Sequence, residues 1–171
     1  MKKLVCLTLL VLFATVLASC AGATPQQVDV EEHDMNGRIY PDLRDYCGEY
    51  QRSEKEPGTA TVDCEVPLLP RIQIGFGWGA KDLTLLQANW SAMTWELHID
   101  DHQINLNEFG QWNSGDQEAL YRGWALDLVN LSPGKHTLRL LWKSETPIDD
   151  GFDIYAPGMY ESIVNFTVLE E

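Results

Sequence analysis

Basic side chains are scarce in this 171-residue sequence. Lysine and arginine together number 12, against 26 aspartates and glutamates, which gives a formal net charge of −14 at pH 7. A surface this negative repels phosphate backbones and anionic lipid headgroups. The composition therefore argues against nucleic acid as a partner and leaves cationic partners or calcium. Acidity also serves the solubility of an exported domain, which is the simpler explanation.

Long apolar runs are missing too, except for one near the start of the chain. The run from Leu4 to Leu17 follows Lys2 and Lys3. As a helix these residues reach roughly 21 Å at 1.5 Å per residue, short of a hydrocarbon core about 30 Å thick. A positive start followed by a short apolar run is the layout of an export signal, and it disfavours a permanent transmembrane helix.

The apolar run ends in Leu17-Ala18-Ser19-Cys20. This ending resembles the lipobox of bacterial lipoproteins. The resemblance implies that a signal peptide of residues 1–19 is removed and that the thiol of Cys20 carries a diacylglyceryl group. It thus implies an extracytoplasmic protein, lipid-anchored to a bacterial membrane at the cell surface or facing the periplasm. The alternative is an ordinary secretory signal that is cleaved near residues 21–23, with Cys20 lost.

Cysteine is scarce as well, with four in the chain. Cys6 falls in the signal and Cys20 is the expected lipid site, so Cys47 and Cys64 form the one remaining pair. Outside the cytoplasm such a pair is normally oxidised. A disulfide closing a loop of this size stabilises the fold by about 3 kcal/mol. A metal site or a catalytic thiol would need further cysteine or histidine ligands that the sequence does not offer.

Helical periodicity is rare, and a period of two dominates from Thr59 onward. Apolar and polar side chains alternate, which is typical of half-buried strands. The first alternating run places Val62, Cys64 and Leu68 on the core side, and a later one interleaves apolar residues with three glycines, which indicates a bulge or a close backbone neighbour. The predicted strands cover residues 62–68, 71–78, 93–99, 104–106, 124–128, 138–142 and 164–168.

One segment breaks the period of two. Leu83, Leu86 and Trp90 recur at helical spacing, and Asp82 stands where it can cap the first turn. Residues 20–41 hold few large apolar side chains and are predicted to form a lipidated, flexible tether. For residues 42–171 the pattern predicts a mainly β domain, an antiparallel two-sheet β-sandwich with one short helix.

The run Leu-Ser-Pro-Gly-Lys-His-Thr-Leu-Arg-Leu at residues 131–140 resembles the penultimate hairpin of immunoglobulin-like and fibronectin-like sandwiches in bacterial surface proteins. The resemblance implies an immunoglobulin-like sandwich and brings no active site with it. The spacing of Cys47 and Cys64 does not match the buried cysteine pair of antibody domains. An antibody-like subtype is therefore not expected.

Three acidic segments invite a metal-site interpretation. The preferred calcium candidates share one glycine-containing loop and are Asp149, Asp150 and Asp153. Their alternative is a polar loop without a ligand. The segment Glu32–Ile39 echoes a calcium loop but has leucine at its twelfth position instead of a bidentate glutamate. His98 and His102 have the spacing of zinc ligands on a helix, but they fall on a predicted strand and turn, which disfavours zinc.

The six tryptophans are many for a chain of this length. Most of them fall on the inward faces of predicted elements. Four aromatic residues lie in glycine-rich or loop segments and are candidates for ligand contact: Trp78, Trp112, Tyr155 and Tyr160. Because aromatic faces pack against sugar rings, an envelope glycan is a candidate ligand.

These observations support three hypotheses about function. The first is a membrane-anchored lipoprotein whose non-catalytic β-sandwich has a structural, adhesive or partner-binding role at the cell envelope. The second is a carbohydrate-binding module that uses the loop aromatics. The third, an envelope enzyme acting on glycans, needs two carboxylates about 5 to 9.5 Å apart, a tertiary fact that the sequence does not give. No serine in a nucleophile elbow is visible, so the enzyme has the least support.

Overall fold

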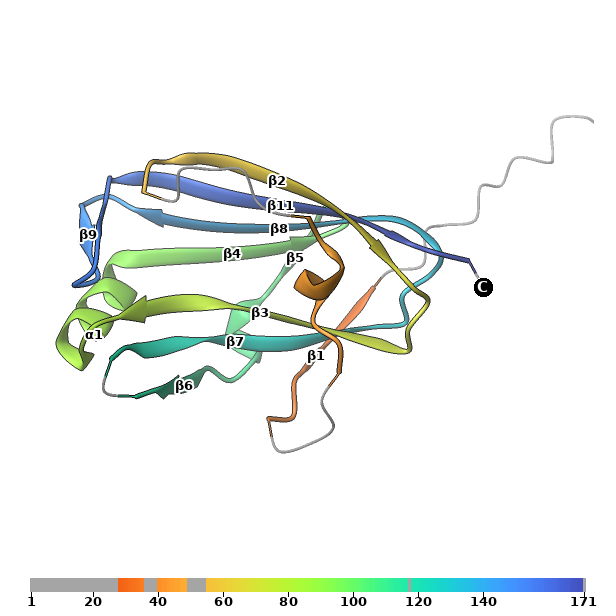
Figure 1. Cartoon of the computed structure of the whole chain (residues 1–171), viewed down its shortest axis with the longest axis horizontal. Helices are drawn as coiled ribbons and strands as arrows, with labels where there is room; N and C mark the ends of the chain where they lie inside the picture. The colour runs from red at the N-terminus through yellow and green to blue at the C-terminus, as the bar shows by residue number, and fades with distance from the viewer. Residues whose placement is uncertain (1–27, 36–39, 49–54, 117, 171) are drawn as a thin grey trace, which may run out of the picture.

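The computed structural model describes residues 28–35, 40–48, 55–116 and 118–170 (Figure 1). The predicted signal, Cys20 and most of the predicted tether lie outside these ranges, as do residues 36–39 of the segment that echoes a calcium loop. Within the described ranges, no helix combines the length and the apolar character that crossing a bilayer requires.

Two main sheets form a sandwich, as the alternating pattern predicts. The first sheet has the order β1-β7-β3, and β6 also pairs with β7. Its strands are β1 (Asp29–Glu32), β3 (Arg71–Ala80), β6 (Trp112–Gly115) and β7 (Leu120–Val129). In Figure 1 these strands lie in the lower half of the molecule, roughly along its long axis.

The second sheet has the order β2-β11-β8-β4-β5. Its strands are β2 (Gly58–Val66), β4 (Met93–Ile99), β5 (His102–Ile104), β8 (Gly134–Ser144) and β11 (Gly158–Val168). A separate pair, β9 (Ile148–Asp149) with β10 (Ile154–Tyr155), lies at the same end as the helix (Figure 1). Six predicted strands are present as placed, whereas the one predicted at residues 104–106 is β5, which ends at Ile104, and Leu106 begins the 3-10 helix η2 (Leu106–Glu108). The sequence pattern missed the short strands β1, β6, β9 and β10.

The sandwich is not purely antiparallel, which corrects the prediction. β2 and β11 pair in parallel over their full common length, from Gly58 with Tyr160 to Val66 with Val168. The other strand pairs are antiparallel. Alternation indicates which side chains face the core, but it carries no information about strand direction, so the sequence could not reveal this pair.

The disulfide between Cys47 and Cys64 is present, with the two Cα atoms 4.3 Å apart. Cys64 lies on the core side of β2, together with Val62 and Val66, as predicted. Leu68 was expected on the same face, but β2 ends at Val66 and Leu68 is exposed. The disulfide attaches the segment that follows the 3-10 helix η1 (Leu43–Tyr46) to the edge strand of the second sheet.

The predicted helix is α1 (Leu83–Ala92), which joins β3 of the first sheet to β4 of the second. The carboxylate of Asp82 caps it by accepting the backbone N–H of Leu85 at 2.9 Å. Leu86 is buried as predicted, whereas Leu83 is exposed. Leu83 lies in the first turn of the helix, beyond the area that the sheets cover.

β1 lies within the stretch for which the sequence predicted a flexible tether, residues 20–41. Its four residues pair with β7, in a register that joins Asp29 with Val129 and Glu32 with Leu126. Val28 is buried in the core, and the backbone N–H of His33 donates to Ala125. The folded part of the chain thus begins well before residue 42. The strand is too short for its alternation to stand out from a polar segment.

The turn between β4 and β5 confirms the predicted hairpin. Asp100 and Asp101 both have positive φ, 48° and 66°, which suits a two-residue hairpin turn. The Asp100 carboxylate accepts the backbone N–H of Thr137 at 2.8 Å and contacts Nδ1 of His136 at 2.6 Å. These contacts fix the hairpin to β8. They offset the cost of the left-handed backbone conformation at Asp100 and Asp101.

Candidate functional site

The four aromatic residues predicted to contact a ligand do not share an exposed surface. Tyr160 is 0% exposed and Trp78 is 8% exposed. Trp112 and Tyr155 are half-buried. The prediction that Trp78 and Tyr160 present their rings to a ligand is therefore wrong, because both side chains point into the sandwich.

Trp78, Tyr155 and Tyr160 instead form an aromatic cluster with Trp142. The rings of Tyr160 and Trp142 are stacked, with centroids 3.8 Å apart. Trp78 meets Trp142 and Tyr155 edge-on, at 5.2 and 4.8 Å. The Tyr160 hydroxyl donates to the carbonyl oxygen of Ala156 at 2.7 Å, which satisfies its buried polar group. This cluster closes the core at the end where α1 lies.

Trp112 lies in a groove on the outer face of the first sheet. The groove has a volume of about 470 Å³. Residues from β3, β6 and β7 form most of it, and η1 contributes Arg44. Its lining residues are Met35, Arg44, Gln73, Gly75, Phe76, Gly77, Trp78, Gly79, Trp112, Ser114, Tyr121, Arg122 and Ala125.

The floor of this groove is bare backbone, for a reason visible in the alternation of β3. Ile72, Ile74 and Trp78 point into the core. The alternate residues of the strand face outward, and three of these are Gly75, Gly77 and Gly79. With no side chain at three outward positions, the sheet surface itself is accessible along β3.

The glycines also reflect a close approach of two strands. Gly77 is paired with Gly123 of β7. A Cβ on Gly77 would stand 2.1 Å from the carbonyl oxygen of Arg122, and one on Gly123 would stand 2.2 Å from that of Phe76. The expected close backbone neighbour is thus β7. A bulge, the other expectation, is not seen, because the register runs unbroken from Arg71 to Ala80.

Two aromatic side chains border this glycine floor. Trp112 of β6 stands opposite Gly123 of β7. Tyr121 covers Gly79, where an added Cβ would meet the Tyr121 ring at 2.6 Å, and it is 46% exposed. The indole N–H of Trp112 is buried and meets no acceptor in the described part of the chain. An aromatic border over a flat floor suits a flat or extended ligand.

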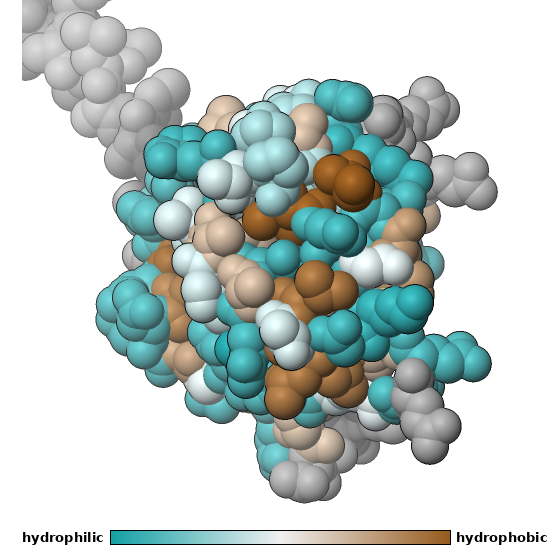
Figure 2. Space-filling view, turned by 90° about the vertical axis from the view of Figure 1, so that its left-hand side faces the viewer, coloured by the Kyte–Doolittle hydropathy of each residue, from teal (hydrophilic) through white to brown (hydrophobic). Residues whose placement is uncertain are grey.

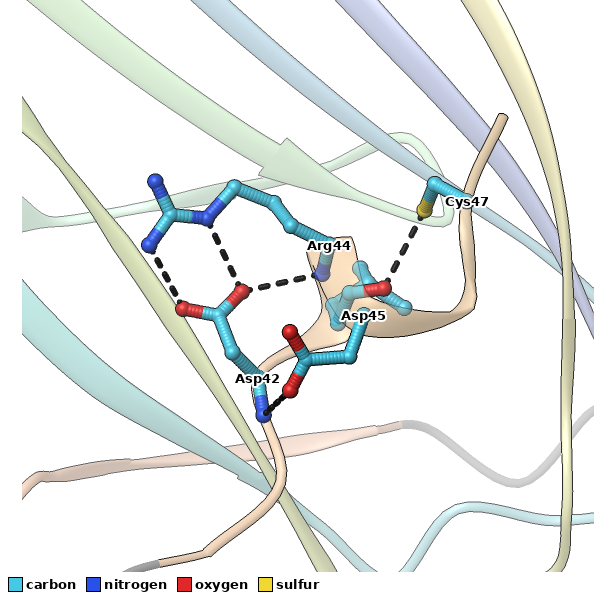
Figure 3. Close-up of polar contacts among 5 residues, drawn as sticks. Asp42, Arg44, Asp45 and Cys47 are labelled. Carbon is cyan, nitrogen blue, oxygen red and sulfur yellow. Dashed lines mark hydrogen bonds and ion pairs between the residues drawn. The ribbon is translucent and has the colours of Figure 1, made fainter. Parts of the chain in front are cut away.

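At the η1 end of the groove, Arg44 is held by a local ion pair (Figure 3). Its Nη2 lies 2.7 Å from one carboxylate oxygen of Asp42, and its Nε donates to the other at 3.0 Å. Burial tends to raise the pKa of the Asp42 carboxyl, but its hydrogen bonds with Arg44 prevail and hold the pKa below the usual range. The carboxylate of Asp45 accepts the Asp42 backbone N–H at 3.3 Å, which completes the cap of η1.

Two arginines contact the groove, and Arg44 is the one whose side chain lies at its outer face. Arg44 and Arg122 are among its lining residues, and none of these is an aspartate or a glutamate. Nε of Arg122 donates to the side-chain oxygen of Asn113 at 2.9 Å, and its guanidinium lies over the ring of Trp90. Arg122 is the ladder partner of Trp78 and shares its core-facing side of the sheet, so the outer groove presents the charge of Arg44, which is paired with Asp42.

A network of charged groups lies further along the same face. Asp127 of β7 is only 1% exposed and contacts Nδ1 of His33 at 2.8 Å. Nη1 of Arg71 donates to its other oxygen at 3.1 Å, and Nη2 of Arg71 contacts Glu31 at 2.6 Å. The network joins β1, β3 and β7. Because the carboxylate of Asp127 is engaged on both oxygens, we assign it a structural role.

The acidic loop proposed to bind calcium uses its carboxylates for other contacts. Asp150 accepts the backbone N–H groups of Phe152 and Asp153 at 2.8 and 2.7 Å. Asp149 accepts that of Gly151, and Asp153 pairs with Lys55. Among the described residues, no three histidine, cysteine or acidic side chains come together as metal ligands would. Asp149, Asp150 and Asp153 therefore form a turn and do not converge on one point.

His98 and His102 do not form a metal site either. Nε2 of His98 lies 3.3 Å from a carboxylate oxygen of Glu96 on the same strand. Nδ1 of His102 lies 2.9 Å from the carbonyl oxygen of Asp100 in the hairpin turn. The two rings have separate local partners, as expected for a strand that leads into a turn.

A second surface of interest is the end of the sandwich formed by α1 and the β9–β10 hairpin. It exposes Leu83, Phe152 and Ile154. Figure 2 faces this end and shows several apolar patches bordered by hydrophilic side chains. Phe152 and Tyr121 both line a hollow of about 220 Å³. Since Tyr121 also lines the outer groove, this apolar end continues into it.

Most residues of the groove were not singled out from the sequence. The alternation with Gly75, Gly77 and Gly79 was the available signal, and it predicted a bulge or a close backbone neighbour rather than a groove. Tyr121 and Arg44 carry no local signal, because they reach the groove from β7 and η1 through the tertiary fold. Trp112 is the one predicted ligand residue that borders the groove from outside the core.

Comparisons with known proteins add little to this geometry. No family model matches the chain, and no curated protein matches its sequence. Among solved structures, one described as PbICP-C in complex with falcipain-2 is similar to it at 14% identity, covering 69% of this chain and 95% of that one. The TM-score is 0.36, which is too low to equate residues between the two chains.

Proposed function

We propose that this protein is a non-catalytic, partner-binding β-sandwich, held at a bacterial cell envelope by a lipid on Cys20. The observation that supports binding is the groove along β3, with its glycine floor and its border of Trp112 and Tyr121. Ligand sites are concave and largely apolar, with a few polar groups at fixed positions, and this groove fits that description. The partner is a component of the envelope.

The absence of catalysis is part of the proposal. The two histidine–aspartate pairs in the described residues are used to hold strands together. Asp127 pairs with both His33 and Arg71, and His136 contacts Asp100 through Nδ1 and the carbonyl oxygen of Ser132 through Nε2. Both ring nitrogens of His136 are therefore engaged, and Nδ1 of His33 is held by a carboxylate that also binds Arg71.

A glycan is the second candidate ligand. Trp112 and Tyr121 border a flat floor, and aromatic faces pack against the apolar faces of sugar rings. Arg44 and Gln73 in the same groove carry hydrogen-bond donors for hydroxyl groups. This candidate needs only the border of the groove, whereas an extended protein segment uses the whole length of β3.

Ligand screens with matched variants test the binding proposal. The full chain in detergent is presented to a glycan array and, separately, to extracts of envelope proteins. Binding through the groove is expected to fall at least tenfold on Trp112→Ala and on Tyr121→Ala. The control is Met159→Ala, which removes an exposed side chain on the other sheet. Binding that survives both groove variants and fails with Met159→Ala contradicts the proposed site.

The lipid anchor has its own test. Cells expressing the full chain are grown with labelled palmitate, and the protein is purified and analysed for incorporated label. Label in the wild-type chain and none in Cys20→Ser is the expected result. An unlabelled wild-type protein in the culture medium would instead support an ordinary secretory signal that removes Cys20.

A further inference from the structure

The outer edge of β3 is occupied at both of its ends by other parts of the chain. The backbone N–H of Gln73 donates to the carbonyl oxygen of Pro41 at 2.8 Å. Just past the strand, the N–H of Lys81 donates to the carbonyl oxygen of Asp150 at 2.7 Å. Both bonds point away from β7, the one strand that pairs with β3 among the described residues.

Between these two bonds the edge is open. Backbone N–H and C=O groups of alternate residues in a strand point the same way. The residues that share the direction of Gln73 and Lys81 are Gly75, Gly77 and Gly79. In the part of the chain that the structure describes, none of the three has a backbone partner on this edge. Gly77 is exposed, although Gly123 opposite it in the ladder is buried.

We propose that this open edge, from Gly75 to Gly79, binds an extended segment of a partner protein as an added β-strand. The inference rests on the proposed function, since it names the partner class and binding mode of the same groove. Strand addition satisfies the N–H and C=O groups of the glycines with main-chain hydrogen bonds. The bonds to Pro41 and Asp150 limit the added strand to about five residues at 3.3 Å per residue.

Hollows on both faces of the edge can take alternate side chains of such a strand. On the outer face lies the 470 Å³ groove. On the inner face, beside η1, lies a mainly apolar hollow of about 180 Å³, lined among others by Ile74, Phe76 and Leu140. Successive side chains of a strand point to opposite faces, so one set enters each hollow. The fitting sequence is apolar at the positions that face the inner hollow. At the outward positions it is neutral or acidic, because the Arg44 guanidinium lies there beside Gly75.

Other occupants fit the edge less well. A second copy of this chain would bring together two molecules that each carry a net charge of −14. A glycan does not carry donors and acceptors at the regular two-residue repeat that the edge presents. The edge also lacks the usual protection against pairing, which is a charge, a proline or a bulge. By contrast β2, an edge strand of the other sheet, presents Asp63 and Glu65 to solvent.

The test uses the full chain in detergent and a displayed library of random nine-residue linear peptides without cysteine. The tightest peptide is synthesised, and its affinity is measured by fluorescence anisotropy. Hydrogen exchange is then measured with and without the peptide. Slower exchange at the amides of Gly75, Gly77 and Gly79 is expected, because the added strand accepts these N–H groups.

Peptides that each carry one N-methyl group, at successive positions, test the binding mode without changing the protein. In strand pairing only every second peptide N–H faces β3. Methylation is therefore expected to weaken binding about tenfold at alternate positions and within about threefold at the others. A scan without this alternation overturns strand addition.

Two variants at one position supply the matched control on the protein side. Gly75→Pro removes an N–H that faces the open edge and takes no part in the ladder with β7, and proline is tolerated at such positions. Gly75→Ala keeps the N–H, and its Cβ has no neighbour closer than the Arg44 guanidinium at 4.0 Å. Peptide binding is expected to be about tenfold weaker with proline than with alanine, because the two variants differ in the backbone N–H. Thermal melting checks that both variants fold.

The outcomes separate this inference from the proposed function. Peptides that protect the α1 end instead of β3 overturn strand addition. Glycan binding that is lost with Trp112→Ala but unchanged with Gly75→Pro also overturns it, while upholding the groove as a binding site. If neither peptides, envelope proteins nor glycans bind at the groove, the proposed function fails as well.

Discussion

At the scale of single residues, Asp127 shows how a buried charge is used in this fold. It lies on β7 and contacts His33 of the segment after β1 and Arg71 of β3. Asparagine keeps one acceptor oxygen and puts an NH2 donor in place of the other, so one of the two partners loses its acceptor and both lose the charge. We expect Asp127→Asn to lower the free energy of unfolding by about 2 kcal/mol.

Urea denaturation of the two proteins measures this loss. The control is Asp63→Asn, whose carboxylate is exposed and accepts a surface hydrogen bond from Asn165. It should change stability by less than about 0.5 kcal/mol. Equal effects of the two substitutions would contradict the structural role assigned to Asp127.

Glu161 gives the stability a dependence on pH. A hydrogen bond from Arg139 lowers the pKa of the Glu161 carboxyl, and burial acts in the opposite direction. A hydrogen bond from the Thr59 hydroxyl lowers this pKa further. Because the pKa is lower in the folded state, the carboxylate stabilises the fold above its unfolded pKa. That contribution is lost as the pH falls through the lower, folded pKa. Asp42 acts in the same sense, since its pKa is also lowered.

Glu161→Gln tests this sign. The difference in unfolding free energy between wild type and variant is expected to be largest at neutral pH and to shrink as the pH falls below the ordinary value of 4.5. Denaturation curves between pH 7 and pH 3 measure it. A difference that stays constant over this range would show that the Arg139 pair does not depend on the ionised carboxylate.

At the scale of elements, the glycines of β3 are not equivalent. A Cβ at Gly77 collides with the backbone of β7, whereas one at Gly75 meets nothing closer than 4.0 Å. We expect Gly77→Ala to destabilise the fold by about 1 to 3 kcal/mol, as overpacking does. Gly75→Ala should be nearly neutral. Thermal melts of both variants measure this difference in stability. Equal melting temperatures would contradict the close approach of β3 and β7.

The elements also show what alternation can and cannot predict. The strands from β2 to β11 with at least three core-facing residues were predicted, since burial of one face forces a period of two. β1 and β6 are short edge strands with few buried side chains, so their sequences read as polar segments. They nonetheless build the outer face, because β6 carries Trp112 and β1 leads into His33. The groove was therefore hidden from sequence reasoning, although its glycine floor was not.

At the scale of the whole molecule, the net charge of −14 opposes compaction. Like charges on a folded surface are closer together than in the unfolded chain, and salt screens their repulsion. The screening length falls from about 30 Å at 0.01 M to about 8 Å at 0.15 M ionic strength. We expect the melting temperature at pH 7 to rise with sodium chloride over this range. A fall would mean that ion pairs such as that of Arg71 outweigh the general repulsion.

By itself, the sequence determined that this is a mainly β chain with one capped helix and a disulfide between Cys47 and Cys64. These features depend on local patterns and on the count of cysteines, which any fold must respect. It also carries the expectation of an export signal and a lipid on Cys20, which rests on residues outside the described structure.

Only the tertiary structure decided which tryptophans are core, that β2 and β11 run in parallel, and that Trp112, Tyr121 and the β3 glycines share one groove. These facts depend on which strands become neighbours. Neighbours are chosen by the packing of two whole sheets against each other, and no segment of the chain carries that information alone.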